Sequence, residues 1–166
     1  MGGIALAQQD KYTLQVPNGL AFSEFRGYEA WQVISISHNG NLLAATLGNP
    51  VMIEAFAAGI PGNGRPFPNG AKMAKIHWNP KMSETFPSAL VPGTQHDMDF
   101  MVKDSARFAD SGGWGYGEFE YDAASDAFRP GTLADKPPQG NDAKCGFACH
   151  TIVKARDYVF TEFGHR

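Results

Sequence analysis

Residues 32–47 have the sequence QVISISHNGNLLAATL, in which two apolar segments flank an Asn-Gly pair. The first segment alternates apolar and polar side chains, which is the pattern of a half-buried strand. Asn39-Gly40 is the dipeptide that most strongly favours a tight hairpin turn. We therefore predict an antiparallel pair, with one strand over 32–37 and its partner over 42–47.

A short helix is predicted directly after this hairpin. Asn49 is a favourable cap, Pro50 suits the first helical position, and Gly59 suits the position just after the end. We expect this helix to run from 50 to 58. The other elements expected further along the chain are, in order, a loop over 60–70, a strand over 71–78, an irregular segment over 80–93, a strand over 96–102, a helical turn over 103–109, a strand over 114–121 and a loop over 122–142.

The N-terminal residues 1–22 are expected to form a lead-in to a single domain over 23–166. Ser23 is a candidate cap for a helix that would extend to Trp31. Ala5-Leu6-Ala7 has the small-x-small pattern of a signal peptidase site, so the lead-in is interpreted as a signal-peptide remnant, with an ordinary apolar tail as the alternative. Export to the periplasm follows from the first interpretation. The elements together predict an α+β fold, a mostly antiparallel sheet of about five strands with a few packed helices.

The composition sets limits on function. The chain has 166 residues, 43% of them hydrophobic, which is enough for one packed domain. Its formal net charge is -3, which argues against nucleic acid as a partner because phosphate binding needs an excess of lysine and arginine. No apolar run approaches the roughly 18 residues that a membrane span needs.

The segment with the clearest chemistry is Cys145-Gly146-Phe147-Ala148-Cys149-His150. A Cys-x-x-Cys-His motif attaches haem c: the thiols bond to the haem and the histidine becomes an axial iron ligand. Here three residues separate the cysteines, although positions i and i+4 still share one side of a helical turn. A local disulfide, a zinc site and a redox dithiol are the alternatives, and the disulfide is the strongest of them.

Several further patches make the sequence resemble the cytochrome P-460 family, which includes the cytochromes c′-beta. The patches occur in the family's order and cover roughly residues 20–166. They are Phe25-Arg26-Gly27-Tyr28-Glu29-Ala30-Trp31, Phe67-Pro68-Asn69-Gly70, the lysine-bearing segment 72–78, Val102-Lys103-Asp104-Ser105-Ala106-Arg107-Phe108-Ala109, Gly113-Trp114 and Asp157-Tyr158-Val159-Phe160-Thr161-Glu162-Phe163.

The resemblance implies one haem c per chain, bound by Cys145 and Cys149, with His150 as the proximal ligand and an open site on the other side of the iron. It also implies a mostly antiparallel fold and a homodimer. The gap of three residues between the cysteines is the departure, because many family members have two.

Two activities follow from the resemblance. Cytochromes P-460 oxidise hydroxylamine and carry a lysine linked to the haem, whereas cytochromes c′-beta lack that link and bind small gases such as nitric oxide. The matching lysine is Lys75, and Asp99 matches the position of a distal carboxylate that would take protons from a bound nitrogen compound. Simple electron transfer is the third alternative.

Other side chains are weaker candidates for the site. Glu118 is a second carboxylate on the aromatic segment 114–121, and His77 shares a strand face with Lys75. His96 is expected to be a hydrogen-bonded structural residue beside Asp97. Two further histidines and three methionines are expected at the surface or in the core: His38, His165, Met73, Met98 and Met101.

Overall fold

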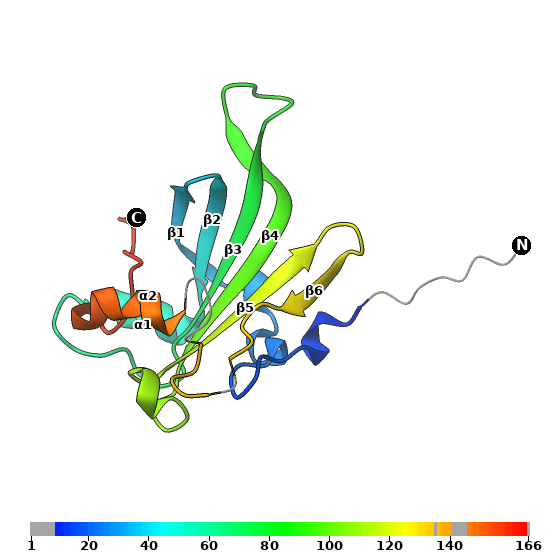
Figure 1. Cartoon of the computed structure of the whole chain (residues 1–166). Coiled ribbons are helices and arrows are strands. Elements are labelled where there is room, and N and C mark those ends of the chain that lie inside the picture. Colours follow the sequence, from blue (N-terminus) through cyan, green and yellow to red (C-terminus); the bar gives the residue numbers. More distant parts are fainter. Residues whose placement is uncertain (1–8, 135, 141–145, 166) are drawn as a thin grey trace, which may run out of the picture.

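One antiparallel sheet forms the centre of the protein (Figure 1). The computed structural model describes residues 9–134, 136–140 and 146–165. Six strands lie side by side in chain order, and each pairs antiparallel with the next. They are β1 (Gln32–Asn39), β2 (Leu42–Gly48), β3 (Lys72–Met82), β4 (Leu90–Lys103), β5 (Trp114–Asp122) and β6 (Ala127–Pro130). The α+β prediction is confirmed.

The hairpin and the first helix form where the sequence predicts them. Asn39 pairs with Leu42 across the turn, and Gly40 has a φ of 57°, a left-handed conformation that glycine adopts without strain. The helix α1 (Pro50–Ala57) begins where the Asn49 side chain accepts a hydrogen bond from the backbone N–H of Met52. These local signals are sufficient to define both elements.

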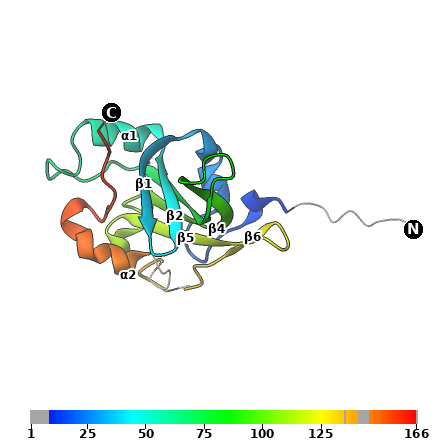
Figure 2. The ribbon, with the colours of Figure 1, turned by 90° about the horizontal axis from the view of Figure 1, so that it is seen from above.

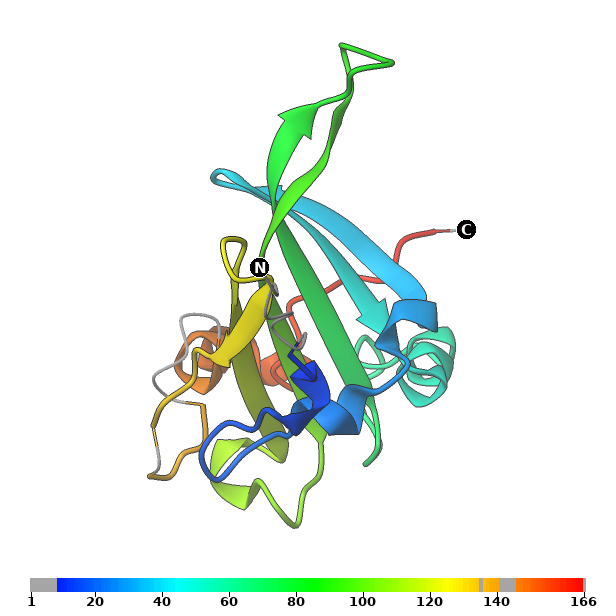
Figure 3. The same cartoon turned by 90° about the vertical axis from the view of Figure 1, so that its right-hand side faces the viewer.

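The prediction of an irregular segment over 80–93 is wrong at both ends of that range. β3 continues to Met82 and β4 begins at Leu90, with Pro80 paired to Pro92. Neither β2 nor β5 pairs with this part of the ribbon, which projects beyond the sheet (Figure 3). Proline has no backbone N–H to donate. It is tolerated here because no further strand lies beside the ribbon to need that hydrogen bond.

The helix expected from Ser23 to Trp31 is also corrected. It is two short 3-10 helices, η2 (Phe22–Phe25) and η3 (Tyr28–Ala30). Gly27 lies between them with a φ of 85°, which interrupts a regular helix. Ser23 is not the cap, because the Glu24 side chain accepts the hydrogen bond from the backbone N–H of Ala21.

Two smaller differences affect the second half of the chain. The helical turn expected over 103–109 is a non-helical turn over 105–107, between the end of β4 and η4 (Ala109–Ser111), and the loop expected over 122–142 contains β6. The remaining elements are η1 (Lys11–Thr13), α2 (Phe147–His150) and η5 (Thr151–Arg156). Within the described part of the chain, every helix is too short or too polar to cross a bilayer.

The sheet separates two hydrophobic cores. The N-terminal segment packs on one face of the sheet (Figure 3), and the buried core on this face includes aromatic side chains from β4 and β5. The opposite face carries α1, α2 and the C-terminal segment, which runs from α2 towards α1 (Figure 2). Phe163 stacks on Phe56 of α1 with ring centroids 5.5 Å apart, so the end of the described chain is held on this second face.

Candidate functional site

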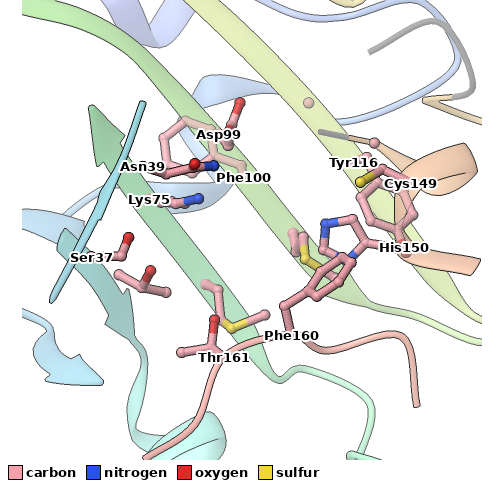
Figure 4. A pocket seen from close by; sticks show the side chains of 15 residues that line it. Ser37, Asn39, Lys75, Asp99, Phe100, Tyr116, Cys149, His150, Phe160 and Thr161 are labelled. Atoms are coloured by element: carbon pink, nitrogen blue, oxygen red, sulfur yellow. The ribbon is translucent and has the colours of Figure 1, made fainter. Parts of the chain in front are cut away.

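A cavity of about 380 Å³ lies on the second face, between the sheet and the C-terminal segment. Its walls come from β1 to β5, from α2 and from Phe160 and Thr161 (Figure 4). Lys75, Asn39 and Asp99 gather on one side of it, whereas Cys149 and His150 lie on the other. Cavities of this size in proteins commonly hold small molecules or cofactors.

Strand register explains why this wall has two parts. Met73 of β3 pairs with Met101 of β4, which pairs with Tyr116 of β5, and these side chains form an apolar part. Two residues along each strand, Lys75 pairs with Asp99. Because side chains two apart share a face, the wall changes from apolar to charged within one step along the strands.

α2 is a single helical turn that brings Cys149 and His150 to the cavity. The His150 ring lies between two aromatic side chains, with its centroid 5.0 Å from that of Tyr116 and 5.1 Å from that of Phe160. Nδ1 of His150 lies 2.6 Å from the carbonyl oxygen of Tyr158. A carbonyl can only accept, so Nδ1 carries the proton and Nε2 has the lone pair that a metal requires.

A buried ion pair fixes the turn that supplies this carbonyl. Asp157 and Tyr158 both have left-handed backbones, with φ of 50° and 64°. Lys103 Nζ lies 2.7 Å from Asp157 Oδ1, and the backbone N–H of Phe67 donates to Asp157 Oδ2 at 2.8 Å. Lys103 and Asp157 belong to two of the patches that resemble the family, and the structure shows that they position the hydrogen-bond acceptor of His150.

The electrostatics of the charged part of the wall centre on Asp99. Burial, together with the nearby Asp97 and Glu118 carboxylates, raises the pKa of the Asp99 carboxyl to about 7 against the opposing charges of His77 and Lys75. A carboxyl with a pKa near 7 takes up and releases protons at neutral pH. The cavity wall therefore carries a group suited to accept a proton.

The structure brings together four of the five residues that the sequence singles out for the site. Lys75, Asp99, Cys149 and His150 all line the cavity. Cys145 lies outside the described residues, so its assignment stays a prediction, and so does the three-residue spacing of the thiols.

The weaker candidates are also placed. Glu118 and His77 lie on the same face beyond Asp99, and His96 Nδ1 is hydrogen-bonded to Asp97 at 2.6 Å, which agrees with the role expected for His96. Met73 and Met101 form cavity wall, and Met98 is buried in the other core. His38 and His165 are exposed, as expected.

Tyr116 is a site residue that sequence analysis placed only in the strand. Its hydroxyl is buried and, among the described residues, has no hydrogen-bond partner. The backbone N–H of Tyr116 donates to the side-chain amide of Gln139, and the same amide donates to the Tyr116 carbonyl. Gln139 thereby makes the hydrogen bonds that a neighbouring strand would make if β6 extended this far. The alternating pattern of the strand 114–121 was the available sequence signal for Tyr116. Nothing in the sequence predicts the contact between Tyr116 and Gln139.

An imidazole with a fixed tautomer, next to a cysteine and at a cavity with a partly apolar wall, is an arrangement that can bind a metal-containing prosthetic group. The chain belongs to the cytochrome P460 family, because the family model described as Cytochrome P460 matches residues 25–161. Membership supports a haem-type cofactor and iron binding. No curated protein matches the sequence.

The residues at the cavity fit a haem. The apolar part of the wall suits a flat porphyrin, and His150 presents Nε2 in the tautomer that binds iron. The buried hydroxyl of Tyr116 is a polar atom that a bound group can satisfy. Cys149, one residue before His150, lies where a thioether would be needed.

Proposed function

We propose that this protein is an exported, periplasmic cytochrome with one covalently bound haem c, which oxidises hydroxylamine or a related small nitrogen compound. Cys145 and Cys149 would hold the haem, and His150 would be the proximal iron ligand. The observation that carries the proposal is the position of Asp99 and Lys75, neighbours on β4 and β3, on the wall of the cavity that His150 faces.

Asp99 is the proposed catalytic base. Oxidation of hydroxylamine removes protons as well as electrons, so a carboxylate near the bound nitrogen compound is needed. Burial and neighbouring carboxylates hold the pKa of Asp99 at about 7, so its ionised form accepts protons around neutral pH. The haem iron, when bound, supplies the binding position for the nitrogen compound and accepts its electrons.

Lys75 is the proposed haem-linked lysine. It lies on β3 between its strand neighbours Thr46 and Asp99, and it faces the cavity. A bond from its Nζ to the porphyrin would change the electronics of the ring and thereby the reactivity of the iron. Without such a bond, its ammonium group would instead favour the ionised form of Asp99.

A second candidate function is reversible binding of nitric oxide or a similar gas, as in the cytochromes c′-beta. The apolar part of the wall, from Met73, Met101 and Tyr116, supports it because a small uncharged gas needs no charged partner. Simple electron transfer is the third candidate and would show two protein ligands on the iron.

Turnover and the optical spectrum of the purified holoprotein test these alternatives together. We expect hydroxylamine to reduce an artificial electron acceptor catalytically, and Lys75→Arg to change the Soret band strongly. Lys72→Arg is the matched control, because Lys72 Nζ donates to the carbonyl of Glu24 away from the cavity. A high-spin spectrum that Lys75→Arg leaves unchanged, with no turnover, would favour gas binding, and a sharp low-spin spectrum would favour electron transfer.

A further inference from the structure

A second cavity adjoins the one that His150 faces. Its volume is about 340 Å³, and Lys75 and Asp99 line both cavities. The wall of the second cavity is more polar than that of the first, and two histidines and two further carboxylates contribute to it: His77, His96, Asp97 and Glu118. Asp99 therefore stands between a mainly apolar space and a more polar one.

A chain of polar contacts leads away from Asp99 along the second cavity. Asp99 Oδ2 lies 3.7 Å from Nδ1 of His77. The same Nδ1 is hydrogen-bonded to Oδ1 of Asp97, and Oδ2 of Asp97 lies 2.6 Å from Nδ1 of His96. Asp97 thus bridges two imidazoles, one carboxylate oxygen to each.

Burial changes along this chain. The side chains of His77 and Asp97 are 10% and 9% exposed, whereas the His96 side chain is 44% exposed. Burial by itself would favour the neutral acid, but the hydrogen bonds from both histidines hold the pKa of Asp97 below its ordinary value. The chain therefore connects the Asp99 carboxyl, whose side chain is 19% exposed, through a more deeply buried, ionised carboxylate to a histidine in contact with water.

We propose that His77, Asp97 and His96 form a proton relay that carries protons from Asp99 to the solvent. This inference rests on the proposed function, because it gives the protons taken from the substrate a way out. One water beside His77 would bridge Asp99 to Asp97, because one oxygen of each carboxyl and one ring nitrogen of His77 lie within 4.8 Å of one another.

The transfer balances without any other reactant. Asp99 passes its proton to Asp97 through one bridging water, while Nδ1–H of His77 keeps its hydrogen bond to Asp97 and holds that carboxylate in place. The exposed His96 exchanges through water to its Nε2–H tautomer, its freed Nδ1 takes the proton from Asp97, and Nε2 releases one to water, which restores the Nδ1–H form. The substrate loses one proton, the solvent gains one, every side chain returns to its starting state, and no electron moves along the relay.

The charges that face Asp99 suit this direction of transfer. Asp97 and Glu118 disfavour a second negative charge, so Asp99 readily takes a proton, while Lys75 and His77 favour its release. A purely structural His77–Asp97 pair needs neither a contact with Asp99 nor a water-exposed second histidine. The relay accounts for both.

Rescue by a soluble base tests the relay during turnover. In holoprotein with His96→Ala, we expect hydroxylamine oxidation to slow by at least about tenfold in weakly buffered solution. Added imidazole should restore the rate in a saturable way, because a small base in the vacated space can accept the proton. The matched control is His38→Ala, which removes another exposed histidine, and it should show neither loss nor rescue. An unchanged rate in His96→Ala, or a loss that imidazole does not restore, would overturn the relay.

A measurement without turnover separates failure of the relay from failure of the proposed function. The carboxylic-acid infrared band of Asp99, assigned by its absence in Asp99→Asn, reports the protonation of Asp99 in the resting holoprotein. After a temperature jump near pH 7, its relaxation should be slower in His96→Ala by at least about tenfold and recover with imidazole. Equal relaxation in both proteins would overturn the relay whether or not hydroxylamine is oxidised. Slowed relaxation in a protein that does not oxidise hydroxylamine would support the relay and reject the proposed reaction.

Discussion

The two faces of the sheet are built from the same strands and yet are packed differently. On the face under the N-terminal segment, aromatic rings meet directly, and the centroids of Phe25 and Phe100 are 4.0 Å apart. On the other face, the C-terminal segment stands away from the strands and leaves the cavity that His150 lines. The closed face is suited to stability and the open face to binding, so mutations on the two faces should have different consequences.

The largest expected effect is on the closed face. Phe22 is fully buried and packs against the rings of Phe100 and Phe119. Phe22→Ala should lower the free energy of unfolding by about 4 kcal/mol, because it leaves a void among these rings. Phe160→Ala on the open face should cost about 1 kcal/mol or less, since Phe160 is 45% exposed. Urea titrations of both variants check this, and equal losses would contradict the comparison.

The next effect concerns the support of the open face. Lys103→Met leaves the Asp157 carboxylate without its buried partner, so we expect a loss of about 3 kcal/mol in the free energy of unfolding. Arg129→Met, which breaks the exposed pair with Glu120, is the matched control and should cost about 0.5 kcal/mol.

The same Lys103→Met variant also tests how His150 is held. If the turn at Asp157 positions the carbonyl of Tyr158, the variant should change the midpoint potential of the haem, because the hydrogen bond to Nδ1 tunes the axial ligand. A potential equal to that of the Arg129→Met control would show that Lys103 has no influence on His150.

Removal of the proposed base should affect turnover more than structure. Asp99→Asn should reduce hydroxylamine oxidation by roughly 100-fold, because the amide cannot accept the proton. In the wild type, the rate should rise with pH through about 7, the pKa of the Asp99 carboxyl, as the ionised base becomes populated. The variant should lose this rise, and retention of it in a pH-rate profile would assign the base elsewhere.

The smallest expected effect is the pH dependence of stability. The pKa of Asp99 is raised on folding, so the folded protein holds a proton that the unfolded chain releases between about pH 4 and pH 7. The stabilisation from this proton is therefore lost as pH rises through about 7. Asp99→Asn should gain stability relative to the wild type as pH rises from about 4 to about 7, and the difference should stay level above pH 7. A constant difference across this range would show that Asp99 is not perturbed.

Most of the fold could be predicted from local signals. Asn39-Gly40 and the Asn49 cap define their elements without help from the rest of the chain. The errors occur where tertiary context decides. β6 is held by pairing to β5, and the prolines of the β3–β4 ribbon are tolerated only because no third strand lies beside them. Neither condition is visible in the local sequence.

The candidate site divides in the same way. The resemblance pointed to Lys75, Asp99 and His150, and the strand register brings the first two together on the cavity wall. The contacts of Tyr158 with His150 and of Gln139 with Tyr116 were beyond sequence analysis, because each joins segments whose proximity depends on the finished fold. The His77–Asp97–His96 cluster needed the register of β3 against β4.

The central claim is that the open face holds a covalently bound haem c next to Lys75. Mass spectrometry of the denatured protein, expressed with haem-maturation machinery, tests it most directly. We predict the mass of the chain plus one haem, with the haem retained on the peptide that contains Cys145 and Cys149 after proteolysis, and joined also to the Lys75 peptide if the lysine is linked. A chain mass without haem would contradict the account.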